Sequence, residues 1–451
     1  MAREHLPIQI GLPRESAWEM EEYPSSRYVA FICGDELPDP ADAFDALGES
    51  FGVAPQDIAP LPTNADEVQW AFRCRIPSRT SPILVWCERV GAADIPDGEV
   101  ADARWSILVE ALLELADPLL DAARLGAIVA RAGGTRTRLM LNPDLGVVYR
   151  LDEIKRLFLA SPPGQLLDER HLYRIEVVAK DRANGPYWLS TVGFWRIGRP
   201  ELEMLEIPAD ELRPALELLD ALASRLATEP MPSAGVPFEA GADLRVALVP
   251  AAEAAETLSD GMPGSLEDRK RLARGPRAAV CAAGKRGRFR PVWMPPHEEL
   301  QAIGRGERAL FLAPRVVEVR ERRARAEWDA FVASFAAHGA DRTRAHFAKV
   351  AVTATGATQE AGHGGGGGDS GRAGIEHVWI EVETADATSV RGIANRIEPV
   401  EGDAASDERT SEGRRIECPI ERVGDWLVRG VVVPGHPMPV DATPESASIL
   451  R

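Results

Sequence analysis

A histidine and a serine near the end of the sequence have the side chains that acyl transfer requires. His338 comes first, and Ser370 follows within residues 368–371, Gly-Asp-Ser-Gly. Acyl transfer needs a nucleophile, a base and oxyanion donors held in one fixed geometry. Ser370 lies just beyond five consecutive glycines, whose backbone is the most permissive of any residue. The short separation from His338 also leaves no room for a two-barrel protease fold, so we exclude serine protease chemistry.

Positive charge is concentrated in the middle of the chain. Residues 284–287 are Gly-Lys-Arg-Gly, but a phosphate-binding P-loop requires serine or threonine after the lysine and a helix behind it. The surrounding charge pattern fits either a solvated face or a site for a small anionic metabolite. The basic residues are Arg269, Lys270, Arg271, Arg274, Arg277, Lys285, Arg286, Arg288 and Arg290.

Histidines and cysteines do not show the spacing of a metal site. The eight histidines include no His-x-x-x-His or comparable pair, which metal binding on a helix requires. The cysteines are odd in number and unpaired in spacing, so we expect reduced, buried thiols. We therefore expect neither a metal nor a cofactor, and carboxylates are too abundant for one acid-base pair to be selected. The cysteines are Cys33, Cys74, Cys87, Cys281 and Cys418.

The segment best suited to binding is residues 376–382, Glu-His-Val-Trp-Ile-Glu-Val. Alternate side chains of a strand point to opposite faces, so the aliphatic residues form a core face and His377 shares the other face with Trp379. A tryptophan on a free face can anchor a protein partner. The alternative is a second layer that buries this face, because large aromatic residues are commonly buried. We group Asn395, Asp425 and Trp426 with these two as candidate binding residues.

The composition is that of a folded acidic protein. Hydrophobic residues make up 45% of the 451 residues, charged residues 27%, and the formal net charge is −18. Affinity for nucleic acid comes largely from phosphates neutralised by Lys and Arg, so we expect no nucleic-acid partner. No apolar run approaches the roughly 20 residues that span a bilayer, and the N-terminus lacks the apolar core of a signal peptide. We expect a cytoplasmic protein without membrane association.

Helix and strand patterns alternate along the chain, which predicts an α+β fold with mixed or antiparallel sheets and helices packed on one face. A single core rarely grows beyond roughly 250–300 residues, so several domains are expected. The Pro- and Gly-containing residues 228–237 predict a linker, and the apolar stripe that starts at Trp328 predicts a helix at the start of the last domain. The predicted regions are 1–232, which could divide near 92–100; 240–312; 313–432, with disordered inserts at 355–374 and 398–414; and a flexible tail at 433–451.

Individual elements are also predicted. Residues 40–51 and 118–132 have the pattern of helices, and the pair Gly133-Gly134 is suited to end the second one. Residues 172–179 and 187–195 alternate as strands around turn-forming residues, which predicts a hairpin. We expect the side chains of residues 187–192 to be packed on both faces of the sheet.

Several short segments near the C-terminus, once combined, resemble the YegJ-like family, a bacterial domain of unknown function. They are residues 346–350 (His-Phe-Ala-Lys-Val), 376–379 (Glu-His-Val-Trp) and 423–426 (Val-Gly-Asp-Trp), with Gly392 and Asn395 between them. The glycine-rich and acidic inserts depart from the family. The resemblance implies no substrate, cofactor or reaction.

An upstream region is similar to the uncharacterised domain that accompanies YegJ-like modules in longer bacterial proteins. Its landmarks are residues 187–189 (Tyr-Trp-Leu), Thr191, Gly193 and residues 200–203 (Pro-Glu-Leu-Glu). Similar proteins often carry a histidine where this chain has Val192. Any chemistry of that histidine is therefore not expected here.

These patterns favour a non-enzymatic binding or regulatory protein that acts through an unidentified protein partner. One alternative is an enzyme or binder that acts on a small anionic metabolite at the basic middle region. A second alternative is an immunity-like partner of another protein. The oligomeric state does not follow from the sequence.

Overall fold

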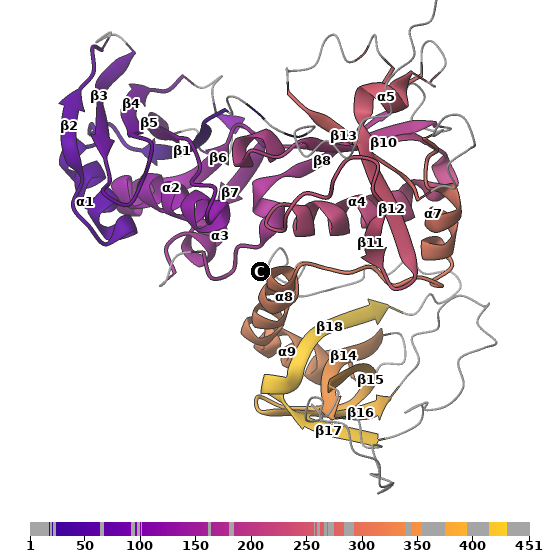
Figure 1. Ribbon diagram of the computed structural model, residues 1–451. Coiled ribbons are helices and arrows are strands. Elements are labelled where there is room, and N and C mark those ends of the chain that lie inside the picture. The colour runs from indigo at the N-terminus through magenta and orange to yellow at the C-terminus, as the bar shows by residue number, and fades with distance from the viewer. Residues whose placement is uncertain are drawn as a thin grey trace, which may run out of the picture. The chain divides into compact units, whose positions relative to one another are not determined.

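The computed structural model has an α+β fold with three sheets (Figure 1), as the sequence predicts. It divides into an N-terminal unit, Met1–Ala313, and a C-terminal unit, Pro314–Arg451, and each is described by itself. The described residues are 18, 20, 24–63, 67–91, 95–96, 100, 102–160, 164–179, 185–256, 258, 262–265, 268, 275–283, 293–339, 344–353, 375–394 and 415–430.

The first sheet of the N-terminal unit has seven strands in the order β2-β3-β4-β5-β1-β6-β7, and all neighbours are antiparallel. Along β1, Ala30 and Ile32 enter the main core, whereas Val29 and Phe31 enter a smaller core on the opposite face. β4 and β5 flank residues 92–100 and are neighbours in this one sheet. The strands are β1 Ser26–Cys33, β2 Gln56–Pro60, β3 Val68–Arg75, β4 Ile83–Arg89, β5 Ala103–Ala111, β6 Thr137–Asn142 and β7 Val147–Arg150.

Three helices accompany this sheet: α1 (Pro40–Phe51), α2 (Pro118–Ala132) and α3 (Leu151–Leu157). The predicted bounds of α1 and α2 are confirmed, and capping explains them. Asp39 accepts a hydrogen bond from the backbone N of Ala41, and Asp117 accepts one from that of Leu120 at 3.0 Å. Such caps satisfy amide groups that the first turn leaves without helical partners. α1 ends at Gly52, whose φ of 70° lies in the left-handed region that glycine tolerates.

The second sheet of the N-terminal unit has six strands in the order β11-β12-β13-β10-β9-β8. β10 and β13 are parallel, and the other pairs are antiparallel. Residues 228–237 therefore connect two parts of one sheet. After α7, Leu310 forms an isolated β-bridge with Gly241. The elements are β8 Arg174–Ala179, β9 Tyr187–Val192, β10 Glu201–Ile207, α4 Leu212–Leu226, β11 Phe238–Gly241, β12 Leu244–Pro250, α5 Ala251–Ala255, β13 Arg277–Ala282 and α7 His297–Gly304.

The C-terminal unit has one antiparallel five-stranded sheet in the order β17-β16-β15-β14-β18. The predicted helix at Trp328 is present as the second of two helices. Trp328 stacks on Phe331 with ring centroids 4.7 Å apart, and Phe331 contacts Trp426 at 5.3 Å. These rings join the helices to one face of the sheet. The elements are α8 Pro314–Ala326, α9 Trp328–His338, β14 Arg344–Thr353, β15 Ile375–Ala385, β16 Ser389–Ala394, β17 Arg415–Pro419 and β18 Val423–Gly430.

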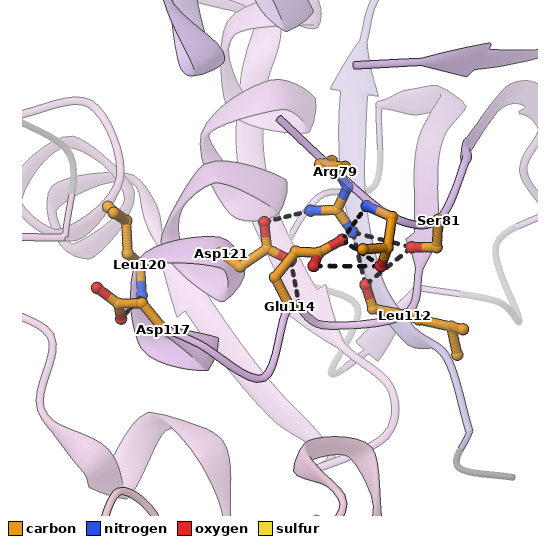
Figure 2. A network of polar contacts seen from close by, with 8 residues as sticks. Arg79, Ser81, Leu112, Glu114, Asp117, Leu120 and Asp121 are labelled. Carbon is orange, nitrogen blue, oxygen red and sulfur yellow. Dashed lines mark hydrogen bonds and ion pairs between the residues drawn. The ribbon is translucent and has the colours of Figure 1, made fainter. Parts of the chain in front are cut away.

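A buried ion pair connects the loop between β3 and β4 to the first turn of α2 (Figure 2). Arg79 donates to the carboxylate of Asp121, and the two side chains are 1% and 3% exposed. Arg79 Nη2 also donates to the carbonyl of Leu112 at 2.5 Å, and Asp121 accepts from the backbone N of Glu114 at 3.1 Å. Burial raises the pKa of the Asp121 carboxyl, and the charge of Arg79 opposes this rise. One charged network thus holds together the loop, the segment between β5 and α2, and α2 itself.

This network gives a prediction for stability. Removing one member of a buried ion pair leaves an uncompensated charge, which costs about 3–5 kcal/mol. We expect Arg79→Met to lower the free energy of unfolding by about this amount, and Arg79→Met with Asp121→Leu to recover most of it. Urea denaturation measures both variants.

The matched control is Arg213→Met on α4. Arg213 pairs with Glu217 at 3.0 Å, but its side chain is 91% exposed, so its loss should change stability by less than about 1 kcal/mol. If the double variant is as unstable as Arg79→Met alone, the uncompensated charge is not the cause.

Candidate functional site

The residues predicted to bind a partner fall mainly on the sheet of the C-terminal unit. His377 and Trp379 belong to β15, where the strand register pairs them with Ala351 and Lys349 of β14. Lys349 also pairs with Asp425 of β18. The register therefore places Trp379, Lys349 and Asp425 in one row across three strands. The side chains of His377 and Trp379, and the whole of Asn395, lie outside the described part of the structure.

Asp425 and Trp426 have different environments. Trp426 is only 2% exposed, and its Nε1 donates to the carbonyl of Ala324 at 3.2 Å. Asp425 is half-buried, accepts from the backbone N of Trp426 at 2.9 Å and lies 3.9 Å from Arg320. Trp426 is therefore part of the core, whereas Asp425 keeps partial access to solvent.

Helices cover one face of this sheet, and the other face carries exposed side chains. α8 and α9 pack on the face that carries Val350 and Ile380, both 0% exposed. On the opposite face, Glu381, Arg391 and Ile393 are exposed, and Ile393 reaches 38%. Within the described part of this unit, helices pack on one face alone. We call the second face the open face and define it by Phe347, Lys349, Glu381, Glu383, Arg391, Ile393, Arg415 and Glu417.

One ion pair crosses the edge of the open face. Arg415 donates to both carboxylate oxygens of Glu383, each at 2.9 Å. These hydrogen bonds lower the pKa of the Glu383 carboxyl. Exposed pairs of this kind contribute little to stability, so the side chains can reorganise around a partner at small cost.

Two further landmarks of this unit have structural explanations. A Cβ on Gly392 would lie 2.2 Å from the carbonyl oxygen of Glu381, so β15 approaches too closely for any side chain. His346 is 2% exposed, contacts the rings of Phe331 and Phe335, and lies 3.1 Å from Ser334 Oγ. Both positions support the core.

The landmarks of the upstream region meet at a buried carboxylate. Glu201 of β10 is 2% exposed and accepts hydrogen bonds from Thr191 Oγ1 at 2.7 Å and from the backbone N of Gly193 at 2.8 Å. A third donor, the backbone N of Trp195, lies at 3.5 Å. Gly193 has φ of 120°, and a Cβ there would lie 2.5 Å from the carbonyl oxygen of Leu172. Glu201 therefore ties β9 and the turn after it to β10.

Burial shifts the protonation of this carboxyl. It raises the pKa of Glu201 to about 7, although the hydrogen bonds from Thr191 and Gly193 and the charge of Arg277 oppose the rise. A pKa near neutrality suits a general acid or base. Both oxygens, however, are held by donors of the chain itself. The described geometry is that of a structural cap.

A second carboxylate of β10 neutralises Arg277. The guanidinium donates to Glu203 Oε1 at 2.8 Å and to Ser190 Oγ at 3.0 Å, and it lies over the ring of Trp195 at 5.0 Å. Glu203 is 0% exposed. Nine basic residues were considered for binding an anionic metabolite, and Arg277 is the one that lies within the described residues. Its charge is already neutralised by Glu203. The other eight members lie outside the described residues.

Sequence reasoning missed this pair of buried carboxylates. The available signal was Glu201 and Glu203 alternating with Leu202 and Met204 in a strand whose other residues, apart from Glu206, are apolar. Buried charges require partners, so two such glutamates predict a nearby arginine. The predicted two-sided packing of residues 187–192 is found in β9, where every residue from Tyr187 to Thr191 is buried. The other strand of the hairpin, β8, is more open, and its Val177 is 43% exposed.

Catalytic and metal sites have little support among the described residues. All five cysteines are free and buried, and burial raises the pKa of the Cys74 thiol to about 11 and that of Cys281 to about 12. No group of three or more His, Cys, Asp or Glu residues in the described ranges could hold a metal ion. His338 ends α9, and Ser370 lies outside the described residues. No helix in the described part is long and apolar enough to cross a membrane.

Comparison with protein families supports the upstream landmarks. Residues 175–281 match the C-terminal part of a family described as protein of unknown function (DUF4026). The match includes Thr191, Gly193, Glu201 and Arg277, and so confirms that a domain of unknown function lies there. It does not extend to the C-terminal segments. Comparison with curated proteins and with solved structures finds no match.

The Glu201 cap predicts a dependence of stability on pH. Its pKa in the folded protein, about 7, lies above the ordinary value of 4.5, so folding favours the protonated form. This contribution is complete below pH 4.5 and is lost as the pH rises through 7. We expect the stability of the wild type relative to Glu201→Gln to fall between pH 5 and pH 8 by roughly 2–3 kcal/mol.

Urea denaturation at both pH values measures this difference. Glu239→Gln is the control, because Glu239 is an exposed glutamate on β11, and its effect should not change with pH. A Glu201→Gln effect that is the same at pH 5 and pH 8 would contradict the protonation argument.

Proposed function

We propose that the protein is a non-enzymatic binding or regulatory protein whose C-terminal unit recognises a protein partner through the open face. The observation that supports this proposal is the one-sided cover of the sheet. α8 and α9 bury one face, while Glu381, Arg391 and Ile393 are exposed on the other. A sheet face with charged and apolar side chains resembles the mixed composition of transient protein interfaces.

The predicted anchor residues belong to the strands of this face. Lys349 lies in register between Trp379 and Asp425. An aromatic anchor with polar neighbours is the arrangement in which a few residues supply most of the binding energy. The net charge of −18 disfavours nucleic acid as the partner.

We also propose that the protein is bacterial and cytoplasmic. We take the C-terminal unit to be a YegJ-like bacterial domain, because the similar segments lie within β14, the first half of β15 and the start of β18. A cytoplasmic location is supported by the five free cysteines, since oxidising compartments favour disulfides. An immunity-like role would use the same face, with the partner as its target.

Substitutions on the open face test the proposal. We expect Arg391→Glu with Ile393→Asp to abolish capture of the partner from a lysate of the source cells, because it changes charge and shape at exposed positions. The matched control is Val317→Asp on α8, an apolar residue that is 40% exposed. Affinity purification with mass spectrometry, and circular dichroism for folding, provide the readouts. The proposal fails if the double variant, folded, retains every protein that the wild type captures.

A double substitution, His377→Ala with Trp379→Ala, tests the predicted anchors directly. A folded variant that no longer captures the partner supports binding. A variant that unfolds shows that these side chains support the core instead.

A further inference from the structure

The N-terminal unit contains a groove that is independent of the open face. It lies between α1 and α3, with the C-terminal end of α2 and the start of β6 at its base, and its volume is about 710 Å³. Figure 1 labels these elements as α1, α2, α3 and β6. The volume falls within the range of about 300–1,000 Å³ that is usual for small-ligand sites.

The two walls of the groove carry opposite charge. α1 contributes Asp42, Asp45 and Glu49, which share one side of the helix because residues three and four apart are neighbours. The opposite wall carries basic residues from the end of α2, the start of β6 and α3. They are Arg131, Arg138 and Lys155.

The base of the groove is apolar. Ala46, Ala130 and Ile154 line it, and each is at most 2% exposed. Leu151 and Leu159 add half-buried side chains from α3 and the residues just after it. An apolar base between charged walls provides both burial and orientation for a ligand.

Part of the charge that lines the groove is paired within the protein. Arg131 Nε lies 3.4 Å from Glu49 Oε2, and Arg131 Nη1 donates to Ser50 Oγ at 2.9 Å. Three other charged residues of the lining, Asp42, Asp45 and Lys155, form no ion pair with any described residue. Arg138 donates from Nη1 to the carbonyl of Thr135 at 2.9 Å, which leaves other guanidinium donors available. Charges of both signs therefore remain available across one apolar base.

We propose that this groove binds a zwitterionic ligand, an amino acid or short peptide with free termini. Its ammonium group lies against Asp42 and Asp45, its carboxylate against Arg138 and Lys155, and an apolar side chain rests on Ile154. An arginine guanidinium binds a carboxylate through two parallel hydrogen bonds. The acidic wall disfavours ligands that carry only negative charge, and the basic wall disfavours those that carry only positive charge.

Capped ligands provide the first test. The full chain is mixed with a set of free dipeptides with apolar side chains, with the same set acetylated at the N-terminus, and with the set amidated at the C-terminus. Saturation-transfer NMR measures binding. We expect the free dipeptides to bind and each capped set to bind about tenfold more weakly, because each cap removes a charge-assisted hydrogen bond. Equal binding of the three sets, or no binding of any at millimolar concentration, would overturn the proposal.

Variants locate the site. Lys155→Met and Asp45→Asn remove exposed charges that support no described contact, and each should weaken the free dipeptides about tenfold. Asp152→Asn is the matched control, since Asp152 is exposed on α3 but does not line the groove. Binding that is unchanged in both groove variants would show that the dipeptides bind elsewhere. The dipeptide tests do not depend on the proposed function, because the groove and the open face belong to different units.

Discussion

The arrangement of the N-terminal unit depends on the buried hydrogen bonds made by the turn between Gly193 and Gly198. On one side, Glu201 accepts hydrogen bonds from the backbone of Gly193 and from Thr191 Oγ1. On the other side, Arg196, which is 3% exposed, donates to Ser26 Oγ at 3.1 Å and to the carbonyl of Leu172 at 2.8 Å. Ser26 begins β1 of the first sheet, so one turn joins both sheets through buried charge. Such groups are stable only when they are paired, and the turn conformation is therefore specified closely.

This constraint assigns a structural role to much of the region that matches a domain of unknown function. Glu203 neutralises Arg277, and Glu201 caps the turn, so the most deeply buried charges already have partners within the chain. The accessible charged groups that line a candidate binding surface lie outside this region. They are found on the rim of the groove beside α1 and on the open face of the C-terminal sheet.

The two accessible surfaces differ in what they can recognise. The open face is broad and carries mixed side chains on strands, which suits another protein. The groove lies between α1 and α3 and has charges of both signs on opposite walls, which suits a small zwitterion. Each surface belongs to a different unit, so one protein can present two independent recognition sites.

Local patterns determined much of the fold. The bounds of α1 and α2 follow from Asp39 and Asp117 as caps and from the glycines at their ends, because capping depends on neighbouring residues alone. The α+β class and the helix at Trp328 follow from periodicity in the same way. Tertiary structure alone decided which strands share a sheet. The parallel pairing of β10 with β13 joins residues on both sides of 228–237, and no local pattern records such a contact.

For the candidate sites, too, local features were predictable from the sequence, whereas burial and long-range contacts were not. Alternation along residues 376–382 placed His377 and Trp379 on one side of a strand, and the sequence by itself could go no further, because cover of a face depends on where distant helices pack. The structure showed that α8 and α9 cover the opposite face and that Trp426 is in the core. It also brought Glu203 and Arg277 within 2.8 Å and formed the groove from α1, α2 and α3. Sequence alone determined local conformation, since that depends on neighbours in the chain, whereas burial and charge pairing required the folded arrangement of segments that are far apart in it.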